Sequence, residues 1–212
     1  MSKFLQKRSL LTLCLPFLVS GISLPALSQV TLLKNPLDSL PVRERVSLRQ
    51  GKPVVSGENG DYTARILVDA TPSQAWSVIT DYKNYSHFMP NVIASSVLES
   101  NGNKYIFEEV DRFHVALFVN VTARTRIAVT ETPQSSFKFQ MVEGKLKQLQ
   151  GSWDIQPVSS YPGTPITQVL LTHNIQAQPK SKTNKSIFYR IFRRHLEETV
   201  KAVRQEVIRR SS

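Results

Sequence analysis

Apolar and polar residues alternate over several long stretches of the chain. In residues 62–68 every second side chain is apolar, namely Tyr62, Ala64, Ile66 and Val68. Because successive side chains of a strand point to opposite faces of a sheet, this spacing predicts a half-buried β-strand. We expect a helix directly afterwards, since Thr71 is a favourable N-cap residue and Pro72 stands at the first helical position.

Residues 92–177 show the periodicity of strands and none of a helix. The predicted long strand 113–129 has apolar residues at most odd positions, among them Phe113, Leu117 and Val119. The same alternation continues through Phe137, Phe139 and Met141, and later through Val169, Leu171 and Ile175. These segments are separated by turn-forming residues, so they predict an antiparallel meander with one apolar face turned inward.

The end of the chain follows a helical period. After a polar joint at residues 179–185, apolar residues recur three or four positions apart: Phe188, Phe192, Leu196, Val200, Val203 and Val207. This spacing predicts one face of an amphipathic helix of about six turns. Its basic residues fall on the opposite face, which leaves the apolar stripe free to lie across the sheet.

This order of elements predicts an α+β domain in which a curved antiparallel sheet wraps around the long C-terminal helix. Such wrapping leaves a hollow between the sheet and the helix. The inward faces are rich in Phe and Met, which commonly line apolar pockets. Two interpretations stay open: a ligand fills the hollow, or the same side chains fill it as an ordinary core.

The first residues predict a secretory signal peptide over residues 1–28. Basic residues precede an apolar run over residues 10–22, and Ala26 and Ser28 fit a cleavage signal before Gln29. An uncleaved membrane anchor is the alternative, although the run is shorter than the roughly 20 residues that a bilayer requires. We therefore expect an exported protein, in the periplasm or another extracytoplasmic compartment.

A length of 212 residues favours one domain once the N-terminus is removed. Residues 29–60 are rich in turn formers, so we interpret them as an N-terminal linker with a hairpin over residues 43–56. The folded domain is then expected over residues 61–212. The single cysteine, Cys14, lies in the predicted signal peptide, so the mature chain has no thiol for a disulfide or a thiolate metal site.

Basic residues concentrate near the C-terminus. The formal net charge of +11 falls to +8 without the three basic residues of the predicted signal peptide. Residues 180–212 carry ten Lys and Arg against three Glu. In an exported protein this indicates an anionic membrane surface as a partner rather than nucleic acid. A merely solvated helix face explains the same charges equally well.

Two motifs resemble one known family. Residues 70–90 lead from a Trp-containing helix to an acidic residue and then to aromatic residues and proline: Trp76, Asp81, Tyr82, Tyr85, Phe88 and Pro90. This stretch resembles the opening of the START-related polyketide cyclase and coenzyme Q-binding proteins. Residues 143–155, with Gly144, Gly151 and Trp153, are similar to a strand of the same family.

The resemblance extends over about residues 62–210. It implies a helix-grip fold of the START/Bet v 1-like type, with a cavity for sterols, quinones, lipids or polyketides. Some members of that family only carry the ligand, and others cyclise it. The resemblance marks Trp76, Tyr85, Phe88 and Pro90 as packing or rim positions.

The inward faces and the resemblance together give a set of predicted cavity-lining residues: Trp76, Phe88, Phe113, Leu117, Val119, Phe137, Phe139, Met141, Trp153, Leu171, His173, Phe188, Phe192 and Leu196. No catalytic residue, metal ligand or cofactor is assigned. The sequence has no nucleophile elbow, phosphate-binding glycine loop, dinucleotide motif or His-Glu-x-x-His motif.

The four histidines are candidates for chemistry. His173 belongs to the inward set, where it can meet the polar head of a ligand. A buried histidine that is satisfied by a neighbouring backbone group or a tyrosine hydroxyl is the plainer interpretation. His87, His114 and His195 are expected on the surface, because none has a carboxylate partner at the spacing of a triad or a metal site.

Acidic residues gather near one strand end. Glu108, Glu109 and Asp111 are interpreted as a solvated edge that pairs with Arg124 or Arg126 across the sheet. This group is therefore not assigned to the cavity.

The sequence favours non-catalytic binding or transport of an apolar small molecule, a lipid or an isoprenoid quinone, in the cell envelope. The alternative is a polyketide-type cyclase, aromatase or hydrolase that uses His173 and a carboxylate in the same cavity. A third hypothesis is a scaffold protein whose basic helix docks on a membrane or a partner.

Overall fold

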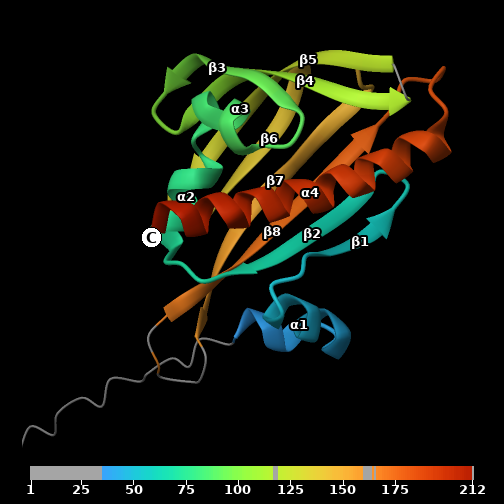
Figure 1. The fold of residues 1–212 in the computed structure, drawn as a ribbon. Helices are drawn as coiled ribbons and strands as arrows, with labels where there is room; N and C mark the ends of the chain where they lie inside the picture. Colours follow the sequence, from blue (N-terminus) through green and yellow to red (C-terminus); the bar gives the residue numbers. More distant parts are fainter. Residues whose placement is uncertain (1–34, 117–118, 160–163, 165, 212) are drawn as a thin grey trace, which may run out of the picture. The chain divides into compact units, whose positions relative to one another are not determined.

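The computed structural model describes residues 35–116, 119–159, 164 and 166–211, which lie in one compact unit (Figure 1). Its strands are β1 (Val54–Glu58), β2 (Asp61–Val68), β3 (Val92–Asn101), β4 (Lys104–Ala116), β5 (Val119–Thr132), β6 (Ser136–Glu143), β7 (Gln148–Ser159) and β8 (Ile166–Gln178). Its helices are η1 (Pro36–Ser39), α1 (Val42–Arg49), α2 (Pro72–Ile79), η2 (Tyr82–Asn84), α3 (Tyr85–Phe88) and α4 (Lys185–Ser211). The predicted signal peptide lies outside the described residues.

All eight strands form one antiparallel sheet in the order β1-β2-β8-β7-β6-β5-β4-β3. In Figure 1 the sheet curves around α4, which crosses its concave side. The second half of the apolar stripe of α4 is buried there: Leu196, Val200, Val203 and Val207 are at most 2% exposed. The prediction of a curved sheet wrapped around the C-terminal helix is confirmed.

The helix predicted after the first long strand is α2. The Thr71 hydroxyl accepts a hydrogen bond from the Gln74 backbone N–H, and the Gln74 side chain accepts one from the Thr71 backbone N–H. This capping box satisfies two backbone donors at the helix start, and Pro72 needs no partner at the first position. Ala75 and Ile79 are fully buried against the core.

The segment before residue 54 differs from the expected linker and hairpin. Residues 42–49 form the helix α1. The hairpin begins after this helix, where β1 pairs with β2. Leu37 and Leu48 are fully buried on the outer face of the sheet, against Leu67 and Leu170. The turn-forming residues of this segment predicted an exposed linker. A helix as short as α1 is stabilised mainly by packing against the rest of the protein, which the local sequence does not show.

The predicted long strand 113–129 is two strands, β4 and β5, which end at Ala116 and begin at Val119. Phe113 pairs with Val121 across the two strands, so both side chains face the same side of the sheet. Both positions are odd in the sequence. The odd positions therefore share one face at Phe113 and at Val121, and alternation alone does not distinguish a hairpin from one continuous strand.

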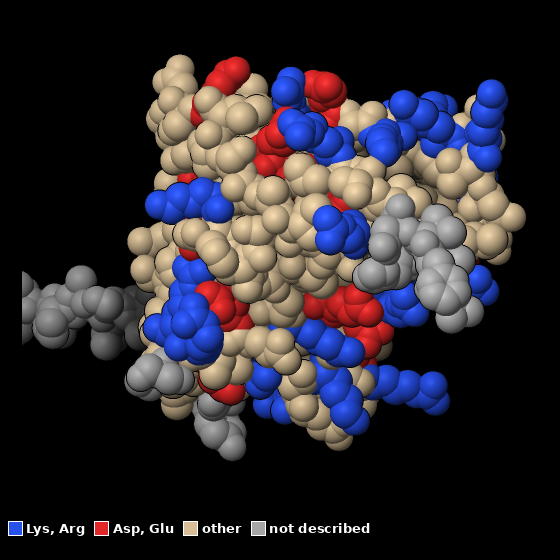
Figure 2. Space-filling view, turned by 45° about the horizontal axis from the view of Figure 1, so that its top comes forward, with Lys and Arg blue, Asp and Glu red and all other residues tan. Residues whose placement is uncertain are grey.

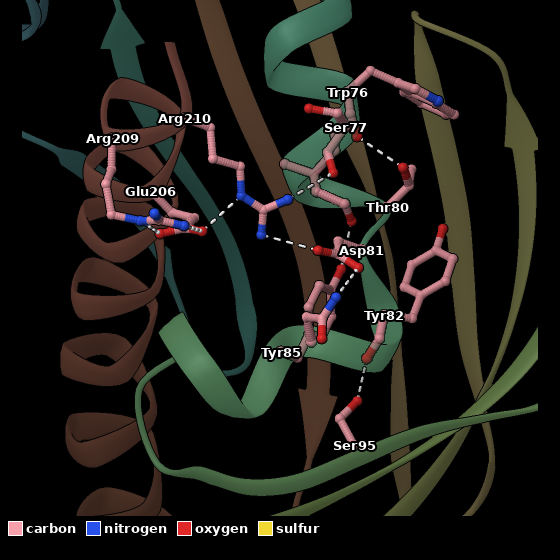
Figure 3. Close-up of polar contacts among 12 residues, drawn as sticks. Trp76, Ser77, Thr80, Asp81, Tyr82, Tyr85, Ser95, Glu206, Arg209 and Arg210 are labelled. Atoms are coloured by element: carbon pink, nitrogen blue, oxygen red, sulfur yellow. Dashed lines mark hydrogen bonds and ion pairs between the residues drawn. The ribbon is translucent and has the colours of Figure 1, made fainter. Parts of the chain in front are cut away.

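A polar network joins the end of α4 to the segment after α2 (Figure 3). The Arg210 guanidinium lies 2.9 Å from the Asp81 carboxylate and 2.6 Å from the Glu206 carboxylate. Asp81 also accepts a hydrogen bond from the Asn84 side chain at 2.8 Å. The network fixes one end of the gripped helix, and the cavity described next lies farther along it.

Candidate functional site

A cavity of about 220 Å³ lies between the concave face of the sheet and α4, and it is partly open to solvent. The strands β4 to β8 supply most of its wall, and α4 supplies Phe188, Phe192 and Leu196. Lys145, in the connection between β6 and β7, also lines the cavity and is exposed. The hollow predicted from the order of elements is therefore present and is not completely filled by side chains.

Two rings form a stack in the cavity wall. The Trp153 and His173 rings lie parallel with centroids 4.4 Å apart, and the Phe139 ring is 5.6 Å from His173. Phe139 is paired with Gly151 across β6 and β7, where a Cβ atom would lie 2.8 Å from the Phe139 ring. A glycine at this position lets the aromatic wall pack directly on the backbone.

His173 is held as a neutral ring. Its Nδ1 lies 3.1 Å from the Ser152 carbonyl oxygen, an acceptor, so Nδ1 carries the hydrogen. Burial lowers the pKa of His173 to about 4, although the bond to Ser152 acts in the opposite direction. The expected backbone partner for this histidine is present.

His195 lines the same cavity, which corrects its expected place on the surface. Its Nδ1 lies 3.1 Å from the Asn91 side-chain amide, and its ring meets Phe113 edge-on at 5.5 Å. Burial lowers the pKa of His195 to about 4. Of the other two histidines expected on the surface, His87 is exposed, and the side chain of His114 lies outside the described residues.

The acidic group divides between the two faces of β4. Glu108 bonds Arg124 and Arg126 at 2.9 Å each on the outer face, as predicted. Glu109 and Asp111 instead line the cavity, so their assignment to a solvated edge is wrong. Successive side chains of a strand point to opposite faces. Glu109 and Asp111 stand four and two residues before Phe113, so they lie on the same inward face as Phe113.

Both cavity carboxyl groups bind protons more tightly than ordinary side chains. Burial raises the pKa of Asp111 to about 7. Burial, and next the neighbouring Asp111, raise the pKa of Glu109 well above its ordinary value. Below about pH 7 the Asp111 carboxyl group therefore carries a proton in most molecules, and a protonated carboxyl group is both a donor and an acceptor.

Eight of the predicted cavity residues line the cavity: Phe113, Phe137, Phe139, Trp153, His173, Phe188, Phe192 and Leu196. Four others do not line it: Trp76, Phe88, Met141 and Leu171. Leu171 is fully buried in the core, and Trp76 and Phe88 pack at its edge. Leu117 and the side chain of Val119 lie outside the described residues.

Several cavity residues were missed from the sequence, and for most of them a signal existed. Thr125 belongs to the odd set of β5, as Glu109 and Asp111 belong to that of β4. His195 and Thr199 lie three and seven positions after Phe192, a helical spacing on the face that meets the sheet. Polarity, rather than spacing, kept these residues out of the predicted set.

Two further geometric findings bear on function. No group of three or more His, Asp or Glu side chains in the described ranges is arranged to hold a metal ion. Among the helices of the described residues, none combines the length and the apolar character that crossing a bilayer requires.

Solved structures share this architecture. A protein from Thermus thermophilus superposes with a TM-score of 0.60 at 14% identity, covering 71% of this chain and 98% of that one. The Zhui aromatase/cyclase of a Streptomyces species gives 0.57 at 16% identity, covering 71% and 94%. A STAR-related lipid transfer protein from Xanthomonas axonopodis gives 0.58 at 15%, covering 73% and 89%. These likenesses show a helix-grip fold of the START/Bet v 1-like type.

The family follows from the sequence match. Residues 68–204 match the model of the polyketide cyclase / dehydrase and lipid transport family, and the chain belongs to this family. The comparison with curated proteins gave no match. The family includes both enzymes and lipid carriers, so the cavity itself has to indicate which activity fits this chain.

Proposed function

We propose that this protein binds an apolar small molecule, a lipid or an isoprenoid quinone, and carries it without altering it. One observation carries the proposal: a partly open cavity with a largely aromatic and aliphatic wall lies between the first half of α4 and the sheet that grips it. Burying an apolar molecule there removes its surface from water, which favours binding by about 25 cal/mol per Å² of apolar surface buried. The match to a family that includes lipid transport supports the same function.

Extraction of the natively purified protein followed by mass spectrometry tests the proposal. We expect one apolar molecule to copurify in near-stoichiometric amount. Ala123→Phe places a large ring in the cavity and should abolish copurification. Ala128→Phe is the matched control, because alternation in β5 directs Ala128 to the other face. A wild-type protein that is empty, or one loaded equally well after Ala123→Phe, contradicts the proposal.

A cyclase or hydrolase is the second candidate, and one observation favours it. The cavity brings together His195 and the carboxyl groups of Glu109 and Asp111, all with strongly shifted pKa values, as acid–base sites often do. The copurified molecule discriminates between the two functions. A carrier returns the same molecule after prolonged incubation of the loaded protein, whereas an enzyme returns a product that differs in mass or, for a ring closure without loss of water, in chromatographic retention.

Export to the cell envelope is part of the proposal and rests on the predicted signal peptide. N-terminal sequencing of the protein recovered from an extracytoplasmic fraction should begin at Gln29. Recovery from the cytoplasm with Met1 intact would contradict it.

Docking on an anionic membrane would connect the cavity to a source of ligand. Phe188 lines the cavity, and the exposed residues Lys182, Lys185, Ile187 and Arg190 lie before or beside it around the start of α4. On the face drawn in Figure 2, more Lys and Arg side chains are visible than Asp and Glu side chains. Basic groups beside an exposed apolar side chain favour contact with anionic lipid.

A further inference from the structure

Asp111 is an unusual buried carboxyl group. It is only 7% exposed, and no described residue forms a side-chain hydrogen bond or an ion pair with it. No side-chain polar atom in the described residues is fully shielded and without a partner. The carboxyl oxygens of Asp111 are therefore still accessible, and they are accessible from the cavity that Asp111 lines.

Glu109 adds a second carboxyl group to the same wall. It lies two residues before Asp111 on β4, hence on the same face, and its carboxyl group also lacks a hydrogen-bond or ion-pair partner among the described residues. Buried polar groups are nearly always satisfied, because an unpaired one is costly to remove from water. Two neighbouring carboxyl groups without partners in an apolar cavity are therefore suited to a partner that enters it.

The other groups in the wall restrict what that partner can be. His195, His173 and Thr199 are uncharged, and none supplies a positive charge to balance an anion. The only cation among the described lining residues, Lys145, is exposed, and its ammonium group donates to the Thr122 carbonyl oxygen at 2.6 Å. An anionic head group would therefore meet carboxyl groups with no counter-charge beside them.

We propose that Glu109 and Asp111 are the polar anchor of the cavity and select apolar ligands that carry an uncharged hydroxyl or carbonyl oxygen. A carboxyl group of the pair donates a hydrogen bond to that oxygen. The inference rests on the proposed carrier function and specifies the class of ligand. Fatty acids and phosphate-bearing lipids would be disfavoured, and a hydrocarbon would bind without anchoring.

Competition against an uncharged solvatochromic dye bound to the full-length protein tests the anchor. The competitors have the same chain length and differ at one end: dodecanol, dodecan-2-one, dodecane and dodecanoate. Near pH 6 we expect the alcohol and the ketone to displace the dye at about tenfold lower concentration than the other two, as one net hydrogen bond implies.

Variants assign the preference to the pair. In Glu109→Leu combined with Asp111→Leu, the alcohol and the ketone should lose their advantage over dodecane, while dodecane still competes. Glu109→Gln combined with Asp111→Asn retains hydrogen-bond donors and should retain the advantage. Glu108→Leu, on the outer face of β4, is the matched control and should leave all four competitors unchanged.

The possible failures are distinguishable. If the dye and all four competitors fail to bind, the carrier function falls. If they bind but dodecanoate competes best, the result contradicts the anchor and leaves the carrier function supported. The same holds if the double Leu variant keeps the preference for the alcohol and the ketone. Thermal unfolding of each variant confirms that it is folded.

Discussion

The Arg210 guanidinium lies 2.9 Å from the Asp81 carboxylate, so the last turn of α4 is joined to the residue that follows the C-cap of α2. The Arg210 side chain also lies over the Phe88 ring, 5.5 Å from its centroid. Asp81 and Phe88 belong to the motif that carried the family resemblance. Through these two residues the motif holds the gripped helix in place, whereas Tyr85 and Pro90 of the same motif line the cavity.

We expect Asp81→Ala to lower the free energy of unfolding by about 1 to 2 kcal/mol, because it removes a largely buried partner of Arg210. A double-mutant cycle with Arg210→Ala, measured by urea unfolding, should give a coupling of about 1 kcal/mol. Arg209→Ala is the control. Arg209 bonds Glu206 but is 69% exposed and does not reach Asp81, so its loss should cost less than about 0.5 kcal/mol.

The two cavity histidines should be neutral and should carry their hydrogen on different ring nitrogens. The Ser152 carbonyl requires hydrogen on Nδ1 of His173, whereas the Asn91 amide donates to Nδ1 of His195 and leaves the hydrogen on Nε2. Two-bond ¹H–¹⁵N NMR spectra near pH 6 distinguish the two forms. A protonated ring at that pH would contradict the lowered pKa values.

The sequence predicted most accurately the features that depend on regular spacing. The apolar stripe of α4 and the inward face of β5, including Ile127 and Val129, lie where the periodicity placed them. Spacing also indicates where the outer face of the sheet is covered. The consecutive apolar residues at 66–68 and 169–171 pair with each other in β2 and β8, and both faces are buried there. Such pairing indicates a covered outer face, which η1 and α1 provide.

The candidate site was harder to predict because its polar residues contradict the usual rule for charged side chains. The odd positions of Glu109 and Asp111 predict that both side chains face inward. Ionisable groups are rarely buried without a partner, however, so their residue type predicted that both are exposed. Their burial depends on the cavity beside them, which forms only when distant strands and α4 come together. At sites of this kind, the residue type is expected to disagree with the burial that the sequence pattern predicts.

The carboxyl pair should make stability depend on pH in a defined direction. The native-state pKa of Asp111 is raised above its unfolded value of about 3.8, so the native state binds more protons between about pH 4 and pH 7. Stability therefore decreases as the pH rises through that window. Asp111→Asn should become progressively more stable than the wild type over the same range, as measured by urea unfolding.

Other ionisable groups around the cavity define the control for that measurement. Glu109 shifts in the same direction and remains in both proteins, whereas His173 and His195 have lowered pKa values and favour stability as the pH rises from about 4 to 6.5. Tyr85 has a pKa raised by burial and stays neutral throughout. The His and Tyr contributions are common to both proteins, and the pKa of Glu109 is raised less in the variant because the charge of Asp111 is gone. A difference in stability that does not vary with pH would therefore contradict burial of an ionisable Asp111.

Binding to membranes should depend on the start of α4. Lys182→Glu combined with Lys185→Glu reverses two exposed charges near the cavity residue Phe188, so it should reduce sedimentation with phosphatidylglycerol vesicles several-fold. Lys138→Glu reverses an exposed charge on β6 that has no ion pair among the described residues, and it serves as the matched control. Wild-type binding should also weaken at about 1 M salt, where the Debye length is about 3 Å. Equal binding to neutral phosphatidylcholine vesicles, or equal loss in the two variants, would show that the basic start of α4 serves solubility and not docking.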